Sequence, residues 1–174
     1  MKKTPAHVTE LYLQPGEVLF GDHNTRIRTI LGSCVAVTIW NPKLLIGGMC
    51  HYMLASRKSI NNHPLDGRYA NEALDILLER VTRLGLHPSE FHAKIFGGGS
   101  MFSYTKNDNN NRSDVSMKNI ESGCTLVKEH GFSLKATHVG GEGHRQVVFD
   151  IWSGDVWMRQ TPLPSDSASY LRVK

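Results

Sequence analysis

One cysteine and one histidine are the residues best suited to chemistry in this chain. Cys34 follows a Gly-Ser turn and opens an apolar run, and His51 lies late in the next apolar run. An imidazole within hydrogen-bonding reach of a thiol can take its proton and later pass a proton to a leaving group. The two residues therefore predict nucleophilic cysteine catalysis, provided that the fold brings their side chains together.

Both residues belong to a predicted β-hairpin. The runs Cys34–Trp40 and Leu45–Leu54 are rich in apolar and β-branched residues, and an Asn-Pro-Lys turn separates them. If residues 41–44 form the loop, Cys34 lies directly across from His51. Cross-strand neighbours share a face and have Cβ atoms about 4.5–5.5 Å apart. This register would place the thiol beside the imidazole.

A loop one residue shorter gives a different site, with Cys34 opposite Cys50. That register suggests a disulfide or no function at all, and it excludes the first one because a one-residue slip turns every side chain to the other face. Zinc would accept Cys34, Cys50 and His51 as ligands. Since Cys50 and His51 are adjacent on a strand and point to opposite faces, we expect no metal and no cofactor.

Glycines surround the cysteine in the sequence and in the predicted fold. A tight Gly32-Ser33 turn can leave the backbone N–H groups of Ser33 and Cys34 free to bind an oxyanion, although an ordinary turn into a core strand explains it equally well. Gly97 and Gly98 end a predicted strand, and no Lys-Ser/Thr follows as a phosphate loop requires. We expect these glycines to let the backbone pass close to the hairpin, which makes Gly32, Gly97 and Gly98 candidate residues of a substrate cleft.

Length and composition suit one cytoplasmic domain. The chain has 174 residues, 40% of them hydrophobic, and a net charge of +4 with its lysines and arginines scattered. A dense basic block would indicate binding of nucleic acid. The sequence has no such block, so nucleic acid is not expected as a partner. An odd count of three cysteines without a CxxC spacing argues against a secreted disulfide framework. The first residues do not form the apolar segment of a signal peptide. No apolar run is long enough for a membrane helix. Residues 1–10 and 162–174 are expected to be loose tails.

The order of elements predicts an α+β fold, with mixed or antiparallel sheets and two main helices. Apolar residues recur at helical spacing in Tyr69–Leu84, and a second helix is expected over Ser116–His130 with Met117 on its apolar face. Lys106–Asp114 is polar and reads as a loop. Hairpins predominate over strand–helix–strand units, which favours α+β over a doubly wound sheet. The other expected strands are Leu11–Leu13, Glu17–Phe20, Arg26–Leu31, Phe91–Phe96, Phe132–Val139, Gln146–Trp152 and Asp155–Gln160.

Several stretches of the chain resemble the chemoreceptor glutamine deamidases of bacterial chemotaxis, the CheD family. LGSCVAV followed by GGMCHYML is the most specific part of the resemblance. RYANEALDILLERVTRLG, AKIFGGGSMF, the NI of MKNI and VGGEGHRQVVFDIWSGDV follow in the family's order. The resemblance covers roughly residues 10–160.

The resemblance implies both a fold and an activity. It implies a β-sandwich-like core with helices outside, and a protein-glutamine glutaminase in which Cys34 is the nucleophile, His51 the general acid and base, and Thr29 the group that orients the imidazole. A thiolate held by the imidazolium would form a thioester with the glutamine side chain and release ammonia. The implied partners are the cytoplasmic region of chemoreceptors and, where present, a CheC-type phosphatase.

Each of these residues also has a simpler interpretation. Cys34 could be a small buried apolar side chain, His51 a histidine bonded to a backbone carbonyl, and Thr29 a strand residue without a role. The chain as a whole could act as a binding module of the chemotaxis signalling complex with little or no catalysis. Only the positions of the three side chains and an assay can separate these alternatives.

Overall fold

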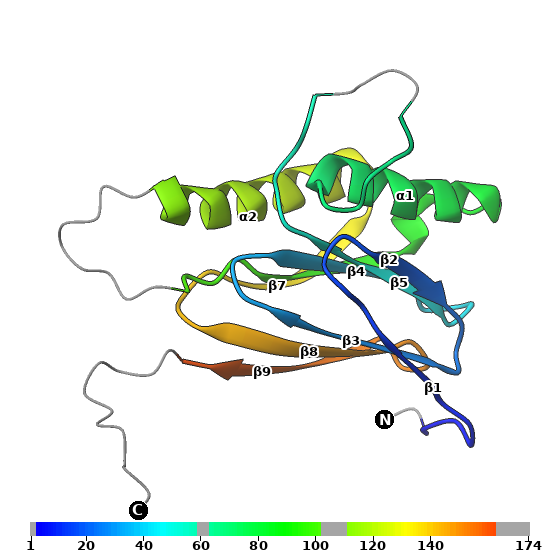
Figure 1. The fold of residues 1–174 in the computed structure, drawn as a ribbon. Helices are drawn as coiled ribbons and strands as arrows, with labels where there is room; N and C mark the ends of the chain where they lie inside the picture. Colours follow the sequence, from blue (N-terminus) through cyan, green and yellow to red (C-terminus); the bar gives the residue numbers. More distant parts are fainter. Residues whose placement is uncertain (1–2, 59–62, 102–110, 163–174) are drawn as a thin grey trace, which may run out of the picture.

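The computed structural model describes residues 3–58, 63–101 and 111–162, and within these two sheets and two α-helices form three layers. A five-stranded sheet has the order β2-β5-β4-β6-β7, and a four-stranded sheet has the order β1-β3-β8-β9. Figure 1 shows both helices on one side of the five-stranded sheet and the four-stranded sheet on its other side. The elements are β1 (Thr9–Tyr12), β2 (Val18–Gly21), β3 (Thr25–Leu31), β4 (Val35–Asn41), β5 (Ile46–Tyr52), α1 (Ala70–Arg83), η1 (Pro88–Glu90), β6 (His92–Gly97), α2 (Asn111–Glu129), β7 (Ser133–Val139), β8 (His144–Asp150) and β9 (Asp155–Thr161).

The predicted α+β class and the sandwich-like core are confirmed. Both sheets are mixed, because β1 pairs with β3 and β6 pairs with β7 in parallel, whereas the remaining ladders are antiparallel. The helices cover only the outer face of the five-stranded sheet. The single domain remains a proposal, and of the expected tail over 162–174 only Pro162 lies among the described residues. The expected tail over 1–10 is wrong at its end, because Thr9 and Glu10 pair with β3 as part of β1.

The predicted hairpin forms from β4 and β5, but with neither predicted register. Ala36 lies opposite His51, and Val37 lies opposite Cys50. Cys34 precedes the last pair of the ladder and does not lie directly across from His51. Since Cys34 is two positions from Ala36, it still belongs to the face of the hairpin that carries His51. The prediction that placed Cys34 opposite Cys50 is wrong, and all three cysteines are free.

The register differs because the turn lies one residue later than predicted. Asn41 pairs with Ile46, and its side-chain oxygen accepts the N–H groups of Lys43 and Leu44, each at 3.0 Å. Leu45 adopts a φ of +54°, which keeps it in the turn and out of β5. A left-handed leucine is uncommon because its Cβ crowds the backbone, so the sequence pattern gives no sign of it.

Two hydrophobic cores lie on the two faces of the five-stranded sheet. The core beneath the helices contains Cys50 and Tyr52 of β5, and the core between the sheets contains Ala36 and Met49. Cys34 packs against the core between the sheets. Alternation along β5 therefore directs Cys50 to the helices and His51 to the four-stranded sheet, and the prediction that the two point to opposite faces is confirmed.

The first predicted helix is confirmed and the second is longer than predicted. α2 begins at Asn111 inside the stretch expected to be a loop, and the rest of that expected loop, 106–110, lies outside the described residues. The face of α2 toward the sheet passes through Ser116, Asn119, Ile120 and Val127. Met117 is 52% exposed, so the prediction that placed it on the packed face is wrong.

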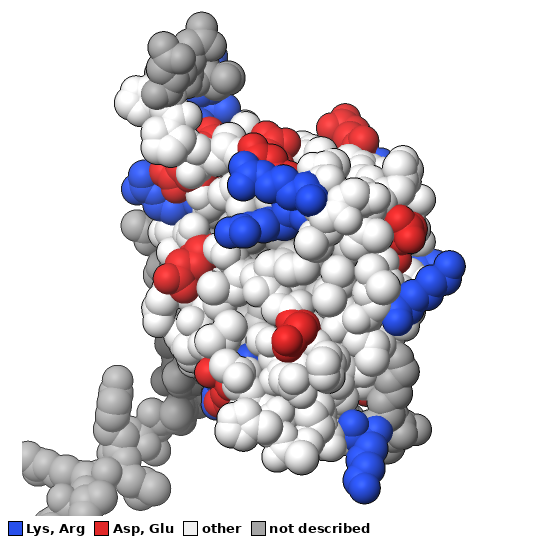
Figure 2. Space-filling model, turned by 90° about the vertical axis from the view of Figure 1, so that its right-hand side faces the viewer, with Lys and Arg blue, Asp and Glu red and all other residues white. Residues whose placement is uncertain are grey.

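The surface carries charges of both signs. On the face drawn in Figure 2, lysine and arginine side chains lie in small groups separated by aspartate, glutamate and uncharged residues. That face has no continuous basic patch of the kind that a phosphate backbone would require. Among the described residues, neither helix is long and apolar enough to cross a membrane.

Candidate active site

The chain crosses from one sheet to the other at the candidate nucleophile. β3 ends at Leu31 in the four-stranded sheet, and β4 begins at Val35 in the five-stranded sheet. Gly32, Ser33 and Cys34 make the crossing. Cys34 therefore lies at an end of the sandwich, where both sheets contribute side chains to its surroundings.

The glycine run after β6 packs directly against this crossing. Gly98 N donates to Cys34 O at 2.8 Å, and Gly99 N donates to Gly32 O at 2.9 Å. Gly97 has a φ of +111°, and a Cβ there would collide with Cys34 O. The structure thus places Gly32, Gly97 and Gly98 beside Cys34, and the close approach of the two backbones explains why glycine is required at position 97.

The backbone N–H groups of Ser33 and Cys34 belong to this crossing. Among the described residues, neither N–H donates to a carbonyl or to a side chain, whereas Cys34 O is bonded to Gly98. Two neighbouring N–H groups without acceptors can stabilise a negatively charged oxygen. The oxyanion role of Ser33 and Cys34 stays a prediction.

A short chain of hydrogen bonds holds the imidazole of His51 from the other sheet. The hydroxyl of Thr29 on β3 donates to Leu13 O at 2.8 Å and lies 2.9 Å from His51 Nδ1. Because a hydroxyl has one proton, which Leu13 O accepts, Nδ1–H must donate to Thr29 Oγ1. His51 Nε2 then carries a lone pair in the neutral ring, and it has no partner among the described residues.

Burial favours the neutral forms of both candidate catalytic groups. His51 is 1% exposed, and its desolvation lowers the imidazole pKa from 6.5 to about 4. Desolvation also raises the pKa of the Cys34 thiol, although a hydrogen bond with the Ser33 side chain acts in the opposite direction. Both effects oppose the resting imidazolium–thiolate pair that the sequence suggested.

Cys34 and His51 are diagonal neighbours on one face of the hairpin. His51 pairs with Ala36, two positions after Cys34. Diagonal neighbours in an antiparallel sheet have Cα atoms about 7–8 Å apart, which long side chains can span. Thr29 and His51 are hydrogen-bonded, and Cys34 belongs to the face of the hairpin that carries His51. Among the described residues, no hydrogen bond joins His51 Nε2 to the Cys34 thiol.

Asn119 of α2 reaches both segments of the site and was assigned no role from the sequence. It is fully buried, and its Nδ2 donates to Met53 O at 2.8 Å and to Ser33 O at 3.4 Å. Ser33 precedes the candidate nucleophile, and Met53 follows His51 by two positions. The sequence signal was an asparagine on the packed side of an amphipathic helix, a place where a polar side chain needs specific partners.

Arg145 of β8 closes the same end of the sandwich behind the glycines. It is 1% exposed, its Nε donates to His138 Nδ1 at 3.1 Å, and its Nη2 donates to Gly140 O. Among the described residues no carboxylate pairs with it, and burial lowers its pKa. Its guanidinium links β8 of one sheet with the end of β7 of the other.

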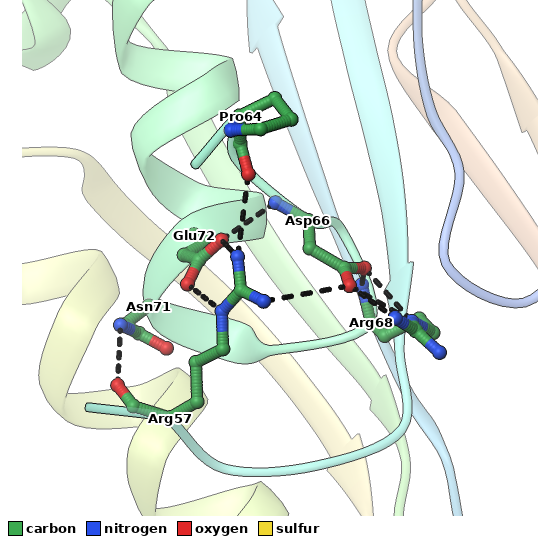
Figure 3. Close-up of polar contacts among 6 residues, drawn as sticks. All are labelled: Arg57, Pro64, Asp66, Arg68, Asn71 and Glu72. Carbon is green, nitrogen blue, oxygen red and sulfur yellow. Dashed lines mark hydrogen bonds and ion pairs between the residues drawn. The ribbon is translucent and has the colours of Figure 1, made fainter. Parts of the chain in front are cut away.

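The segment that follows His51 is held by ion pairs, drawn in Figure 3, and one of them joins it to Glu72 of α1. Arg57 makes a two-point contact with Glu72, at 2.5 and 2.8 Å, and Asp66 pairs with Arg68 at 2.5 Å. Arg68 O accepts the N–H groups of Met53 and of the next residue, so the segment returns to the end of β5. A hollow lined by Gly16, Arg57, His63, Pro64, Asp66 and Arg68 lies there.

Comparisons with known proteins identify relatives that match most of the chain. A family model described as CheD chemotactic sensory transduction matches residues 53–160, a region that begins after His51. A probable chemoreceptor glutamine deamidase CheD from Pseudomonas savastanoi pv. phaseolicola is 46% identical over 161 residues, which are 92% of this chain and 89% of that protein. A probable chemoreceptor glutamine deamidase CheD 3 from Dechloromonas aromatica is 44% identical over 158 residues, 91% of each chain.

Proposed function

Because the chain belongs to the CheD family of chemotactic sensory transduction proteins, we propose that it deamidates glutamine side chains of bacterial chemoreceptors. Its relatives bear the name of that activity. The observation that carries the proposal is the pair of hydrogen bonds that connects Leu13 O with the Thr29 hydroxyl and this hydroxyl with His51 Nδ1. This pair supports a neutral imidazole that carries its proton on Nδ1 and keeps Nε2 open as the proposed base.

The first half of the proposed reaction makes a thioester. Cys34 Sγ attacks the side-chain carbonyl carbon of glutamine while its proton passes to His51 Nε2. The carbonyl oxygen becomes an oxyanion that accepts the N–H groups of Ser33 and Cys34. His51 returns the proton to the departing nitrogen, the C–N bond breaks, and ammonia leaves. Since burial favours the neutral thiol and imidazole, proton transfer accompanies the attack.

The second half of the reaction restores the enzyme. His51 Nε2 takes a proton from water, the resulting hydroxide adds to the thioester carbon, and the C–S bond breaks. The proton returns to Cys34 Sγ, and the product is glutamate. Thr29 takes part only by holding the imidazole, and Gly32, Gly97 and Gly98 form the wall beside the reacting atoms. The reaction requires neither a metal nor a cofactor.

The proposed setting is the cytoplasm, where the helical signalling part of a chemoreceptor presents its glutamines. A CheC-type phosphatase is a second proposed partner. Gel filtration of an equimolar mixture with a purified CheC-type phosphatase tests this point, since a stable complex elutes earlier than either protein alone. Separate elution at micromolar concentrations would remove that partner from the proposal.

The activity is tested with a purified cytoplasmic fragment of a chemoreceptor. We expect the wild-type protein to release ammonia and to convert selected glutamines to glutamate, a mass increase of about 1 Da, with Cys34→Ala inactive. Cys124→Ala is the matched control because Cys124 is a free cysteine packed against the helix-side core. Binding of the fragment without ammonia release by the wild type would instead support the binding-module alternative.

A further inference from the structure

The fully buried side chain of Asn119 joins the two strands of the candidate site from a helix. Its Nδ2 donates to Met53 O and to Ser33 O, and its own backbone oxygen accepts the hydroxyl of Tyr52 at 2.7 Å. Tyr52 in turn lies against α2, where a Cβ at Gly123 would collide with its hydroxyl. One turn of α2 is thus fastened to the end of β5 at two points.

The two carbonyls that accept from Asn119 lie just beyond the end of the β4–β5 ladder. The last paired residues are Val35 and Tyr52. Past this pair, Met53 N donates to Arg68 O, so β5 turns away from β4. The Asn119 amide bridges Ser33 and Met53 where the ladder has stopped. It therefore links the strands at the end that carries Cys34.

The orientation of the Asn119 amide follows from its neighbours. Both atoms near Nδ2 are carbonyl oxygens, so a flipped amide would place Oδ1 against two acceptors. In the observed orientation Oδ1 is buried and has no partner among the described residues. Burying an unpaired acceptor is unfavourable. A side chain whose only role was to hold α2 on the sheet could do so with apolar contacts and would not need a buried amide with an unpaired oxygen.

We propose that Asn119 is a positioning residue that sets the spacing between the Cys34 and His51 segments. This inference rests on the proposed function and deepens it. Asn119 holds Ser33 O, and through it the adjoining N–H groups and the thiol, relative to the strand that carries His51. It touches neither the substrate nor the reacting atoms.

The proposal predicts a specific kinetic signature. Displacement of a reacting group by about 1 Å can lower a rate on the order of 10²-fold, so Asn119→Ala should lower kcat by that order. KM should change little because Asn119 does not contact the substrate. The pH profile of Cys34 alkylation by iodoacetamide, followed by mass spectrometry, should also shift because the thiol moves relative to His51 Nε2.

Asn41 supplies the matched control at the opposite end of the same hairpin. It is 1% exposed and holds the turn through Lys43 N and Leu44 N. We expect Asn41→Ala to lower the melting temperature while leaving kcat and the Cys34 alkylation profile unchanged. Asn119→Asp keeps the size of the side chain but places a carboxylate against two carbonyls. It is the second variant if Asn119→Ala does not fold.

The experiment compares the full-length wild type, Asn119→Ala, Asn119→Asp and Asn41→Ala. A lower kcat and a shifted alkylation profile in the Asn119 variants, but not in Asn41→Ala, supports the proposal. An unchanged kcat and profile in a folded Asn119 variant overturns it and leaves Asn119 with a purely structural role. Absence of ammonia release by the wild type would count against the proposed function alone, because alkylation of Cys34 requires no substrate.

Discussion

The hydroxyl of Thr29 lies 2.9 Å from Nδ1 of His51, although the two residues belong to different sheets. The same hydroxyl donates to Leu13 O, which determines the direction of both hydrogen bonds. The four-stranded sheet therefore selects the tautomer of an imidazole carried by the five-stranded sheet. The hydrogen bond between Thr29 and His51 thus both joins the two sheets and leaves His51 Nε2 unprotonated.

Removal of the Thr29 hydroxyl should impair catalysis without weakening substrate binding. Thr29→Val keeps the shape of the side chain but leaves Nδ1–H without its acceptor, so kcat should fall on the order of 10²-fold with KM little changed. Thr29→Ser keeps the hydroxyl and should retain most of the rate. Steady-state kinetics on the receptor fragment measures both variants.

Thr38→Val is the control for that comparison, because Thr38 is a second buried threonine and lies in β4 of the hairpin. We expect it to alter stability without changing kcat. Equal kcat values for Thr29→Val and the wild type would contradict the orienting role of Thr29.

Burial of His51 should make stability depend on pH. Its pKa is lowered from 6.5 to about 4 in the folded protein, so the unfolded chain binds a proton first as the pH falls. Stability should therefore decrease between about pH 6.5 and pH 4, by up to about 3 kcal/mol from this residue, and the contribution should level off below pH 4. Urea unfolding across this range measures it.

The His51→Gln variant isolates this contribution, since it retains every other titrating group. Its stability should decline less steeply than that of the wild type between pH 6.5 and pH 4. A resting imidazolium–thiolate pair would raise the pKa of His51 and reverse the difference between the two proteins. That reversal would contradict the neutral resting state.

A methyl group at position 97 should disturb the nucleophile. Gly97→Ala places a Cβ against Cys34 O and imposes a left-handed conformation on alanine. We expect a lower melting temperature and a kcat reduced on the order of 10²-fold. Thermal unfolding and the rate of ammonia release measure the two effects.

Gly85→Ala is the control that introduces backbone strain without a collision like that between a Cβ at position 97 and Cys34 O. Gly85 also has a positive φ, of +70°, but no atom lies within 4 Å of the position its Cβ would take. It ends α1, far from Cys34 in the sequence, and should lose about 1 kcal/mol of stability at unchanged kcat. Similar kcat values in the two variants would show that the contact with Cys34 O is unimportant.

One of the two registers considered from the sequence places Cys34 and His51 on one face of the hairpin, but neither predicts the partner of each residue across the strands. Alternation fixes the face, and a two-residue change of register leaves the face unchanged. The partner depends on where the turn ends, and here Leu45 remains in the turn at a positive φ. That is why Cys34 and His51 share a face as expected while Ala36, and not Cys34, lies opposite the histidine.

Other parts of the site depend on contacts that no local pattern contains. The role suggested for Thr29 came from a family resemblance, because nothing in the strand sequence indicates that Leu13 O will accept its proton. Asn119 acquires its importance from two carbonyls far away in the chain. The start of α2 is not predictable for a different reason, since a polar stretch rich in asparagine has weak helix propensity.

The contact between Arg57 and Glu72 should stabilise the segment that follows His51. Glu72 is 6% exposed, and the hydrogen bonds from Arg57 lower the pKa of its carboxyl. Arg57→Met keeps the aliphatic stem but leaves a buried carboxylate unpaired, so the protein should be less stable at pH 7. Below about pH 4.5 the difference from the wild type should shrink, because the carboxyl of Glu72 becomes protonated and needs no partner.

Arg83→Met provides the comparison, because Arg83 pairs with Glu79 on the exposed side of α1, where both side chains are more than half exposed. Surface pairs of this kind contribute about 0–1 kcal/mol. Urea unfolding at pH 7 and pH 4 should therefore show a pH-dependent loss for Arg57→Met and a small, nearly constant change for Arg83→Met. A loss for Arg57→Met at pH 7 as small as that for Arg83→Met would mean that the segment is held by its backbone bonds to Arg68 O, and not by the buried ion pair.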